Sequence, residues 1–239
     1  MKTALISGGA ARIGAQIVRT LHENGYKVII HCHQSEEIAQ ALCRELNSKR
    51  NSSAQVVVAD LGDNEAIKKL TQTIKSLDLL VNNASVFYPT STENSTIEDW
   101  DKIININLRA PFFITTGLSK VLATSQGSIV NIIDIHSDRP LKNHSIYNIS
   151  KAGLKMLTKT LAKDLAPNIR VNGVSPGSIL WPQDPTELSE EEKLNMLDRI
   201  ALKRQGSTED IAEAVLFLAD AKYITGQVIN IDGGRSLNQ

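Results

Sequence analysis

Short apolar runs alternate with longer amphipathic stretches along the whole chain, and this pattern predicts β-strands alternating with α-helices. Such alternation is typical of βαβ units that build a parallel sheet with helices on both faces. No repeat, low-complexity tract or linker interrupts it, so we expect one doubly wound α/β domain over residues 1–239. The expected strands are 3–7, 27–32, 55–59, 77–81, 127–133, 170–174 and 228–231.

Polar residues that cap helices mark where the amphipathic stretches begin. Ser35 is the expected N-cap of the helix over 36–46, and Ser207 that of a helix through Leu218. Ser95 with Glu98, and Ser189 with Glu192, have the spacing of a capping box. Ser95 is expected to open one long helix that runs through Trp100 to about Val121. The other expected helices cover 13–24 with Gly25 just after its end, a segment after Asp63, and a stretch from the region of Tyr147 to 165.

Composition narrows the class of protein. The 239 residues contain 26 Lys plus Arg and 26 Asp plus Glu, so the chain has no excess of positive charge that would indicate binding to nucleic acid or to an anionic membrane. No apolar run reaches the length of a membrane span. The two cysteines, Cys32 and Cys43, lack metal-ligand spacing and cannot form a disulfide framework. We therefore expect a cytoplasmic protein with reduced thiols and no metal site.

A glycine-rich turn joins the first expected strand to the first expected helix, over residues 7–14. Gly8 and Gly14 allow a tight turn, and the helix N-terminus offers N–H donors to a pyrophosphate. The strand before and the helix after make a dinucleotide site the favoured interpretation, against a βα turn without ligand. No carboxylate stands at the end of the second strand to repel a 2′-phosphate, so NADP(H) is favoured, with its contacts expected from Arg12, His31, His33 and Ser35. For each histidine taken alone, a surface position without any contact to the cofactor is an equally good interpretation.

Tyr147 and Lys151 lie four residues apart, and so on one face of a helix. An ammonium beside a phenol is expected to lower the phenol pKa and make Tyr147 a proton donor near neutral pH. Asp134 stands at the carboxyl end of the strand before this helix. The alternatives are a chance pairing on the helix and, for Asp134, a loop carboxylate that caps the following turn.

The order and spacing of several motifs resemble the short-chain dehydrogenase/reductase family over essentially the whole chain. The motifs are residues 7–14, 82–84, Asn107, Tyr147 with Lys151, Pro176-Gly177, 223–226 and 232–234. The resemblance implies a single Rossmann-type domain, a nicotinamide cofactor, hydride transfer and a homotetramer. It also implies a catalytic group of Asp134, Tyr147, Lys151 and Asn107, in which Lys151 holds the nicotinamide ribose and Asn107 orders a helix carbonyl and a water. Further cofactor contacts are implied for Gly8, Arg12, Ile13, Gly14, Asp60, Leu61, Asn83, Ala84, Ser85, Pro176, Gly177 and Ser178.

Three departures from the common family pattern resemble the pteridine reductases. Arg12 replaces the middle glycine of the turn, and Asp134 replaces the serine usually found 13 residues before the catalytic tyrosine. Asn82-Asn83-Ala84 is followed by Ser85-Val86-Phe87 rather than by glycine. The resemblance implies an NADPH-dependent reductase of a pterin or folate substrate. The contrasting hypotheses are a ketone or 3-oxoacyl-thioester reductase of the same fold and a cofactor-bound sensor without turnover.

The chemistry of a pterin suits these residues. Phe87 can stack on one face of the flat ring while the nicotinamide lies on the other, unless Phe87 is ordinary core. Arg12 and Ser85 can bond the ring edge, and Asp134 can pass a proton with Tyr147 to a ring nitrogen. The substrate loop is expected at about 178–205, with Leu180 and Trp181 at the substrate. The segment 232–237 resembles tails that reach a neighbouring subunit's site.

Overall fold

The computed structural model describes residues 1–180 and 189–237. A seven-stranded sheet in the order β3-β2-β1-β4-β5-β6-β7 forms its centre, and every neighbouring pair is parallel. This confirms the doubly wound Rossmann-type sheet. The strands are β1 Thr3–Ile6, β2 Lys27–Cys32, β3 Ala54–Val58, β4 Leu79–Asn82, β5 Ser128–Ile132, β6 Arg170–Pro176 and β7 Val228–Ile231.

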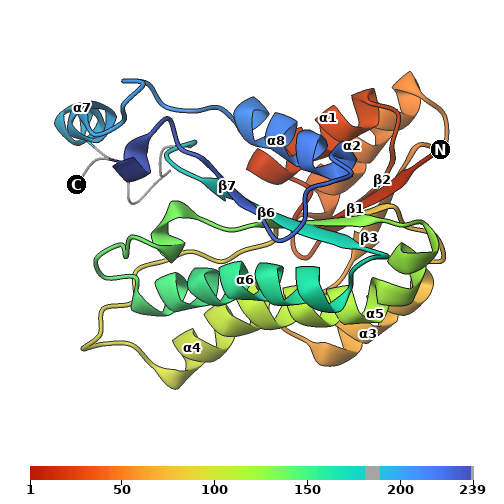
Figure 1. The fold of residues 1–239 in the computed structure, drawn as a ribbon, viewed down its shortest axis with the longest axis horizontal. Helices are drawn as coiled ribbons and strands as arrows, with labels where there is room; N and C mark the ends of the chain where they lie inside the picture. Colours follow the sequence, from red (N-terminus) through yellow and green to blue (C-terminus); the bar gives the residue numbers. More distant parts are fainter. Residues whose placement is uncertain (181–188, 238–239) are drawn as a thin grey trace.

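Two layers of helices cover the sheet (Figure 1). The upper layer in that view contains α1 (Arg12–Glu23), α2 (Glu36–Lys49) and α8 (Thr208–Asp220). The lower layer contains α3 (Asn64–Thr73), α4 (Ile97–Ile104), α5 (Ala110–Thr124) and α6 (Ser145–Asp164), while α7 (Glu190–Asp198) lies at one end. Two apolar cores follow from this arrangement, because alternate residues of each buried strand face opposite layers.

The long helix expected from the Ser95 capping box to about Val121 is interrupted by a π-helical turn. Its parts are α4, the turn η1 (Asn105–Arg109) and α5, which runs on to Thr124. The capping box is Thr96 with Asp99 rather than the expected Ser95 with Glu98. The reason is local: the amide and hydroxyl of Ser95 bond the Ser91 carbonyl at 2.9 and 2.7 Å, which leaves Thr96 as the cap.

The other expected helix starts fall at the right residues. Ser189 with Glu192 forms the capping box of α7, and Ser207 caps α8 together with Asp210. Ser35 occupies the N-cap position of α2, but its side chain makes no capping bond. Gly25 follows α1 with a φ of +86°, the left-handed conformation expected of a C′ glycine.

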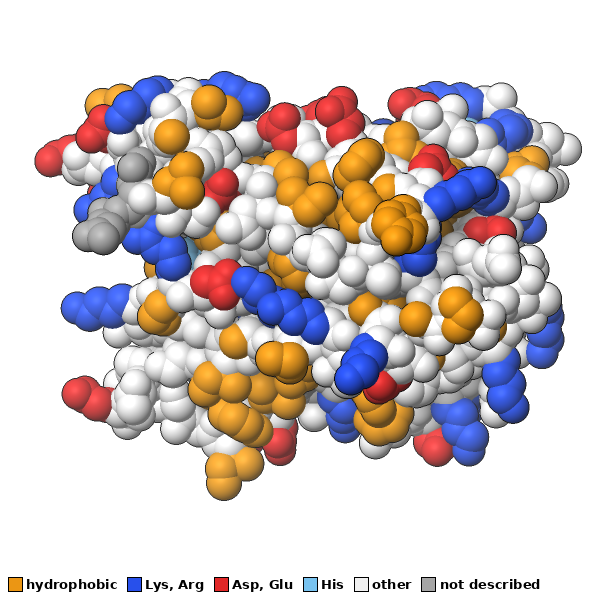
Figure 2. All heavy atoms as spheres, in the orientation of Figure 1, with side chains coloured by type: hydrophobic (Ala, Val, Ile, Leu, Met, Phe, Trp, Pro, Cys, Tyr) orange, Lys and Arg blue, Asp and Glu red, His pale blue; other side chains and the backbone are white. Residues whose placement is uncertain are grey.

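Several exposed side chains on the lower helical layer are apolar. They are Ile97 and Trp100 of α4, Phe112 of α5, and Ile149 and Met156 of α6. Figure 2 shows hydrophobic atoms gathered in the lower part of the view, over the region of α4. Among the described residues, no helix combines the length and apolar character that crossing a membrane requires.

Because all strands are parallel, their carboxyl ends lie along one edge of the sheet. The glycine turn follows β1, and the segment 83–87 follows β4, at the point where the strand order reverses between β1 and β4. Asp134 follows β5, and Gly177 follows β6. Crevices at such a reversal are where open α/β sheets bind ligands, so the fold brings the expected site residues to one edge.

Candidate active site

Tyr147 and Asp134 meet above the end of β5. The Tyr147 hydroxyl donates to Oδ2 of Asp134 at 2.8 Å, and Oδ1 of the same carboxylate accepts from the backbone N–H of His136 at 2.8 Å. The second bond caps the short 3-10 turn η2 (Ile135–Ser137). Asp134 therefore caps the turn with one oxygen and accepts from the phenol with the other.

Lys151 lies one turn along α6 from Tyr147, as their spacing predicts. Its side chain is 2% exposed, and Nζ donates to the Ile132 carbonyl at 3.0 Å. Nζ lies 5.6 Å from the centroid of the Tyr147 ring. Burial lowers the pKa of Lys151 to about 8, although the Asp134 carboxylate acts in the opposite direction.

The expectation that Lys151 lowers the pKa of Tyr147 is wrong in this structure. Burial raises the pKa of the phenol well above its ordinary value, and the Asp134 carboxylate raises it further. The carboxylate oxygen is 2.8 Å from the phenol oxygen, whereas the Lys151 ammonium is directed to a backbone carbonyl. Tyr147 is therefore a neutral hydrogen-bond donor at physiological pH, and its proton is available to a basic acceptor.

Asn107 lies in the π-helical turn and is 1% exposed. Its Oδ1 accepts from the Val86 amide at 2.8 Å, and its Nδ2 donates to the Val86 carbonyl at 3.0 Å and to the Ser150 hydroxyl at 3.2 Å. Ser150 in turn donates to the Tyr147 carbonyl at 2.7 Å. The carbonyl that Asn107 bonds belongs to the loop after β4 rather than to a helix. Through Val86, Asn107 fixes the loop that carries Phe87.

Phe87 is 54% exposed, so it is not a core residue. Its ring meets the Tyr147 ring edge-on, with centroids 4.8 Å apart and an interplanar angle of 78°. One face of Phe87 is covered by the imidazole of His144, which stacks on it at 4.7 Å and 14°. Because the ring remains more than half exposed, it can accept a flat partner beside the Tyr147 hydroxyl.

The glycine turn has the geometry of an anion site. Gly8 has a φ of +62°, and a Cβ on Gly14 would stand 2.1 Å from the Gly8 carbonyl oxygen, so neither position admits a side chain without a shift. Nδ2 of Asn83 donates to the carbonyls of Ser7 and Gly8 at 2.9 and 3.0 Å. The amides of Asn83 and Ala84 donate to the Ser7 hydroxyl at 2.9 and 3.0 Å. The strand-end segment 83–84 thus clamps the turn.

Arg12 begins α1 with a φ of +53°, a left-handed conformation that is strained for any residue with a side chain. The side chain is exposed, and it makes no hydrogen bond or ion pair with another described residue. The first turn of α1 has no acidic residue. A cation here is electrostatically unfavourable unless an anion binds, so the turn, Arg12, Ile13 and the helix end together fit a pyrophosphate.

His31 lies behind the turn rather than at the surface. It is 2% exposed; Nδ1 accepts from the Gly8 amide at 3.1 Å, and Nε2 lies 3.1 Å from the Ala59 carbonyl. Burial lowers the pKa of His31 to about 4. A neutral ring with its proton on Nε2 satisfies both bonds. Both ring nitrogens are used, so His31 positions the turn and has no donor left for the cofactor contact expected of it.

His33, Ser35 and Asp60 lie at the rim beside this turn. His33 and Asp60 are both about half exposed, and Nε2 of His33 is 3.9 Å from Oδ2 of Asp60. Oδ1 of Asp60 accepts from the Gly62 amide at 2.7 Å, and Leu61 is buried. The loop after β3 therefore stands next to the end of β2, and this is where the adenosine half of a dinucleotide was expected.

The segment after β6 forms the opposite wall of the site. The Gly177 amide donates to the Ile231 carbonyl at 3.0 Å, and a Cβ on Gly177 would stand 2.6 Å from Cβ of Asp232. Ser178 accepts a hydrogen bond from the guanidinium of Arg235. Pro176 is buried and Leu180 is exposed, while Trp181 lies outside the described residues.

Two residues at the site were not expected from the sequence. His144 stands three residues before Tyr147, and this spacing, which places both on one side of the start of α6, is the signal that could have identified it. Arg235 was expected only within a tail that reaches a neighbouring subunit's site. In the structure the segment through Leu237 folds onto its own chain, with the Arg139 guanidinium bonded to the carbonyls of Arg235 and Ser236 at 3.1 and 2.9 Å.

Comparison with known proteins places this geometry in a family. The family model described as enoyl-(acyl carrier protein) reductase matches residues 8–236. Pteridine reductase 1 of Leishmania tarentolae is 33% identical over an alignment that covers 99% of this chain and 96% of its own. The 3-oxoacyl-[acyl-carrier-protein] reductases of Staphylococcus aureus and Aquifex aeolicus are 38% identical over 98% of this chain and over 97% and 96% of theirs.

These relatives are reductases that span the chain almost from end to end. The Tyr147 and Lys151 pair, the clamped glycine turn and the parallel sheet are what a nicotinamide-dependent reductase of this fold requires. The protein is therefore an oxidoreductase that uses NAD(P)H. By sheet topology, motif order and similarity over its whole length, the chain belongs to the short-chain dehydrogenase/reductase family.

Proposed function

We propose that this enzyme is an NADPH-dependent pteridine reductase that converts a dihydropterin to the tetrahydro form. The observation that carries the proposal is the pairing of the Tyr147 phenol with the Asp134 carboxylate beside the exposed ring of Phe87. A reductase of ketones needs a donor on a carbonyl oxygen. A carboxylate next to the phenol suits a substrate whose ring presents both N–H donors and a basic nitrogen.

The residues divide the reaction between them. Bound NADPH would supply the hydride for a ring carbon of the C=N bond. Tyr147 gives its proton to the ring nitrogen, so that the C=N bond becomes CH–NH. The high pKa of the Tyr147 phenol keeps its proton in place until that nitrogen becomes basic. Lys151, whose Nζ lies 5.6 Å from the Tyr147 ring centroid, holds the nicotinamide ribose beside the phenol in this proposal.

Phe87, Ser85 and Arg12 bind the substrate in this proposal. The open face of Phe87 stacks on the pterin, and His144 supports the ring from its other face. Ser85 is exposed at the same edge, and Arg12 stands at the glycine turn. Leu180 and Trp181 are proposed at the mouth of the substrate loop.

NADPH rather than NADH is proposed because of the residues around the end of β2. His33 and Ser35 follow the strand with no carboxylate between them, and Arg12 lies across the turn with no protein partner among the described residues. The 2′-phosphate would be held by these three side chains. Asp60, Leu61, Asn83, Ala84, Lys151 and the segment 176–178 are proposed for the remaining contacts to the cofactor.

We also propose a cytoplasmic homotetramer. The exposed apolar residues of α4, α5 and α6 are the surface that we expect other copies to cover. Light scattering on the purified enzyme would return four times the chain mass of 26.1 kDa if this is right.

A 3-oxoacyl-thioester reductase is the second candidate, supported by the 38% identity to such enzymes. Steady-state NADPH oxidation separates the two. The proposal predicts turnover with dihydrobiopterin, dihydromonapterin or dihydrofolate at a kcat/KM well above that for an acetoacetyl thioester. If none of the three is reduced while the thioester is, the enzyme belongs with the acyl-thioester reductases.

A further inference from the structure

Two arginines meet at the edge of the site, on the side of Asp134 away from the cofactor turn. Arg235 lies in the short 3-10 turn η3 (Arg235–Leu237) and its guanidinium donates to the Ser178 hydroxyl. Arg139 follows η2 in the loop after Asp134. Its guanidinium donates to the backbone carbonyls of Arg235 and Ser236 at 3.1 and 2.9 Å. The C-terminal turn is thereby fixed against the loop that carries Asp134.

These two guanidinium groups have no carboxylate partner among the described residues. The two acidic side chains close to Arg235 are Asp134 and Asp232. Both oxygens of Asp134 already accept bonds, from Tyr147 and from the backbone after it. Those of Asp232 accept from the amides of Gly234 and Ser236 at 2.9 and 2.7 Å.

The electrostatic balance at this point favours an anion. Burial lowers the pKa of Arg235, the Asp134 carboxylate raises it, the nearby Arg199 and Arg139 lower it, and Asp232 raises it. Holding like-charged and partly buried groups together costs free energy unless a counter-ion binds. The guanidinium fork matches carboxylate and phosphate oxygens in geometry, and it binds them through two parallel bonds.

We propose that Arg235 and Arg139 bind an anionic group, a carboxylate or a phosphate, on the side chain of the substrate. The inference rests on the proposed function, since it places the reacting ring over Tyr147 and Phe87 and the anionic substituent beyond Asp134. The physiological substrate is then a pterin with a negatively charged side chain rather than one with a neutral polyol. Arg235 and Arg139 set specificity and take no part in proton or hydride transfer.

A second source of the same chemistry is a phosphate of the cofactor, because Ser178, which accepts a hydrogen bond from Arg235, is also proposed as a cofactor contact. The two sources differ in what the variants change. Loss of a substrate contact alters the preference between charged and neutral pterins, whereas loss of a cofactor contact weakens the binding of NADPH. The glycine turn with Arg12 follows β1, on the other side of the strand ends. The weaker NADPH binding expected of an Arg12 variant is therefore the reference for the loss of a cofactor contact.

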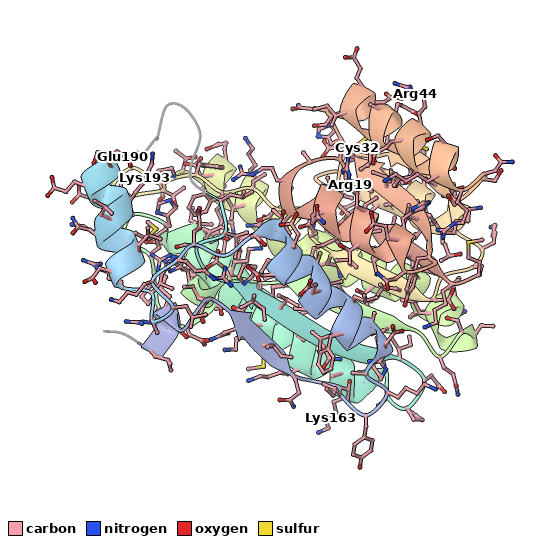
Figure 3. The ribbon with its side chains drawn as sticks, turned by 90° about the horizontal axis from the view of Figure 1, so that it is seen from above. Arg19, Cys32, Arg44, Lys163, Glu190 and Lys193 are labelled. Carbon is pink, nitrogen blue, oxygen red and sulfur yellow. The ribbon has the colours of Figure 1, made fainter. Side chains whose placement is uncertain are left out.

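The test compares the wild type with Arg235→Gln and Arg139→Gln, and uses Arg44→Gln as a matched control. Arg44 projects from α2, at the opposite end of the molecule from α7 with its labelled Glu190 and Lys193 (Figure 3). The kcat/KM values are measured with dihydrofolate, which carries carboxylates, with a phosphorylated dihydroneopterin and with neutral dihydrobiopterin. Calorimetry measures the binding of p-aminobenzoylglutamate, of inorganic phosphate and of NADPH.

We expect Arg235→Gln to lower kcat/KM for one of the two anionic substrates by about tenfold to a hundredfold, the usual loss of a charged hydrogen bond. The value for dihydrobiopterin should stay within about twofold, and binding of the matching anion probe should weaken in parallel. Arg139→Gln should show the same preference more weakly, and Arg44→Gln none. Added salt should reduce the anionic preference of the wild type.

The proposal is overturned if both variants keep the wild-type preference and the wild-type affinity for the anion probes. It is also overturned if they weaken NADPH binding and leave the preference unchanged, because the anion would then belong to the cofactor. Reduction of dihydrobiopterin without any preference for charge rejects this inference and leaves the proposed function intact. If no pterin is reduced, the proposed function fails, and the calorimetry with the anion probes decides the inference.

Discussion

The hydroxyl of Tyr147 lies 2.8 Å from Oδ2 of Asp134, while Oδ1 of that carboxylate holds the backbone of His136. The turn fixes the carboxylate, and the carboxylate fixes the phenol. This order of dependence explains how a side chain 13 residues upstream can orient the proton donor of a reductase. In the proposed reaction, Tyr147 must therefore turn its proton from Asp134 to the substrate.

Tyr147→Phe removes the proton donor and keeps the ring that packs against Phe87. We expect kcat to fall by about 10²–10⁴-fold, the usual contribution of general acid catalysis, with NADPH affinity largely retained. Tyr26→Phe is the matched control, because Tyr26 is buried between β2 and α8 and its hydroxyl lies 3.5 Å from Asp220. Turnover of Tyr147→Phe at the rate of that control would show that the proton reaches the substrate by another route.

Asp134→Ser separates the two candidate reactions. A serine can still cap η2, so the thermal stability of the variant should change little. Pterin turnover should fall by about tenfold or more, because the phenol loses the group that orients it. The thioester reductase hypothesis predicts equal or better activity toward an acetoacetyl thioester. Rates with both substrates, measured on the same preparation, show which prediction holds.

Arg12→Gly should stabilise the protein and weaken its binding of ligands. The φ of +53° is strained for arginine and relaxed for glycine, so unfolding should cost about 1 kcal/mol more in the variant. Binding of NADPH should weaken by about tenfold or more because a charged bond to phosphate is lost, and pterin binding should weaken with it.

Gln126→Gly is the matched control for Arg12→Gly. Gln126 has a φ of +52° in the exposed turn between α5 and β5, away from the site. It should gain stability without any change in NADPH affinity. If Arg12→Gly also changed stability alone, Arg12 would be a solvated helix-start residue.

His31 should make the folded state sensitive to acid. Its pKa in the folded state is about 4, below the ordinary 6.5, so the folded protein takes up fewer protons than the unfolded chain in this range. The contribution of His31 to the free energy of unfolding is therefore complete above pH 6.5 and is lost as the pH falls toward 4. Between pH 7 and pH 5 we expect a loss of about 2 kcal/mol in the free energy of unfolding.

Urea unfolding of wild type and His31→Gln at both pH values measures this loss. A glutamine offers an acceptor to Gly8 and a donor to Ala59, and it does not titrate. His22, whose pKa burial also lowers, is present in both proteins, so their difference isolates His31. An equal acid loss in the two proteins would assign the sensitivity to other groups.

The fold could be predicted from the sequence because the apolar runs mark the strands and the capping residues mark where most of the helices begin. The π-helical turn at residues 105–109 could not, since the apolar pattern runs on through it from α4 into α5. The shifted capping box at Thr96 depends on how Ser95 bonds back to Ser91, which is a feature of the folded turn.

The site was predictable in its members but not in its electrostatics. The spacing of Tyr147 and Lys151 placed both on one helix face, yet the direction of the Tyr147 pKa depends on burial and on the distance to Asp134. His31 was expected either to contact the cofactor or to lie at the surface, and its side chain is instead buried against Gly8. The position of Arg235 on its own chain depends on Arg139, a contact between residues far apart in the sequence.

A crystal structure of the enzyme with NADP⁺ and a dihydropterin tests the proposed pteridine reduction most directly. We expect the ring to lie on the open face of Phe87, with the Tyr147 oxygen and the Asp134 carboxylate within hydrogen-bond distance of ring nitrogens. A ring bound away from Phe87, or a Tyr147 phenol that contacts no atom of the substrate, would contradict it.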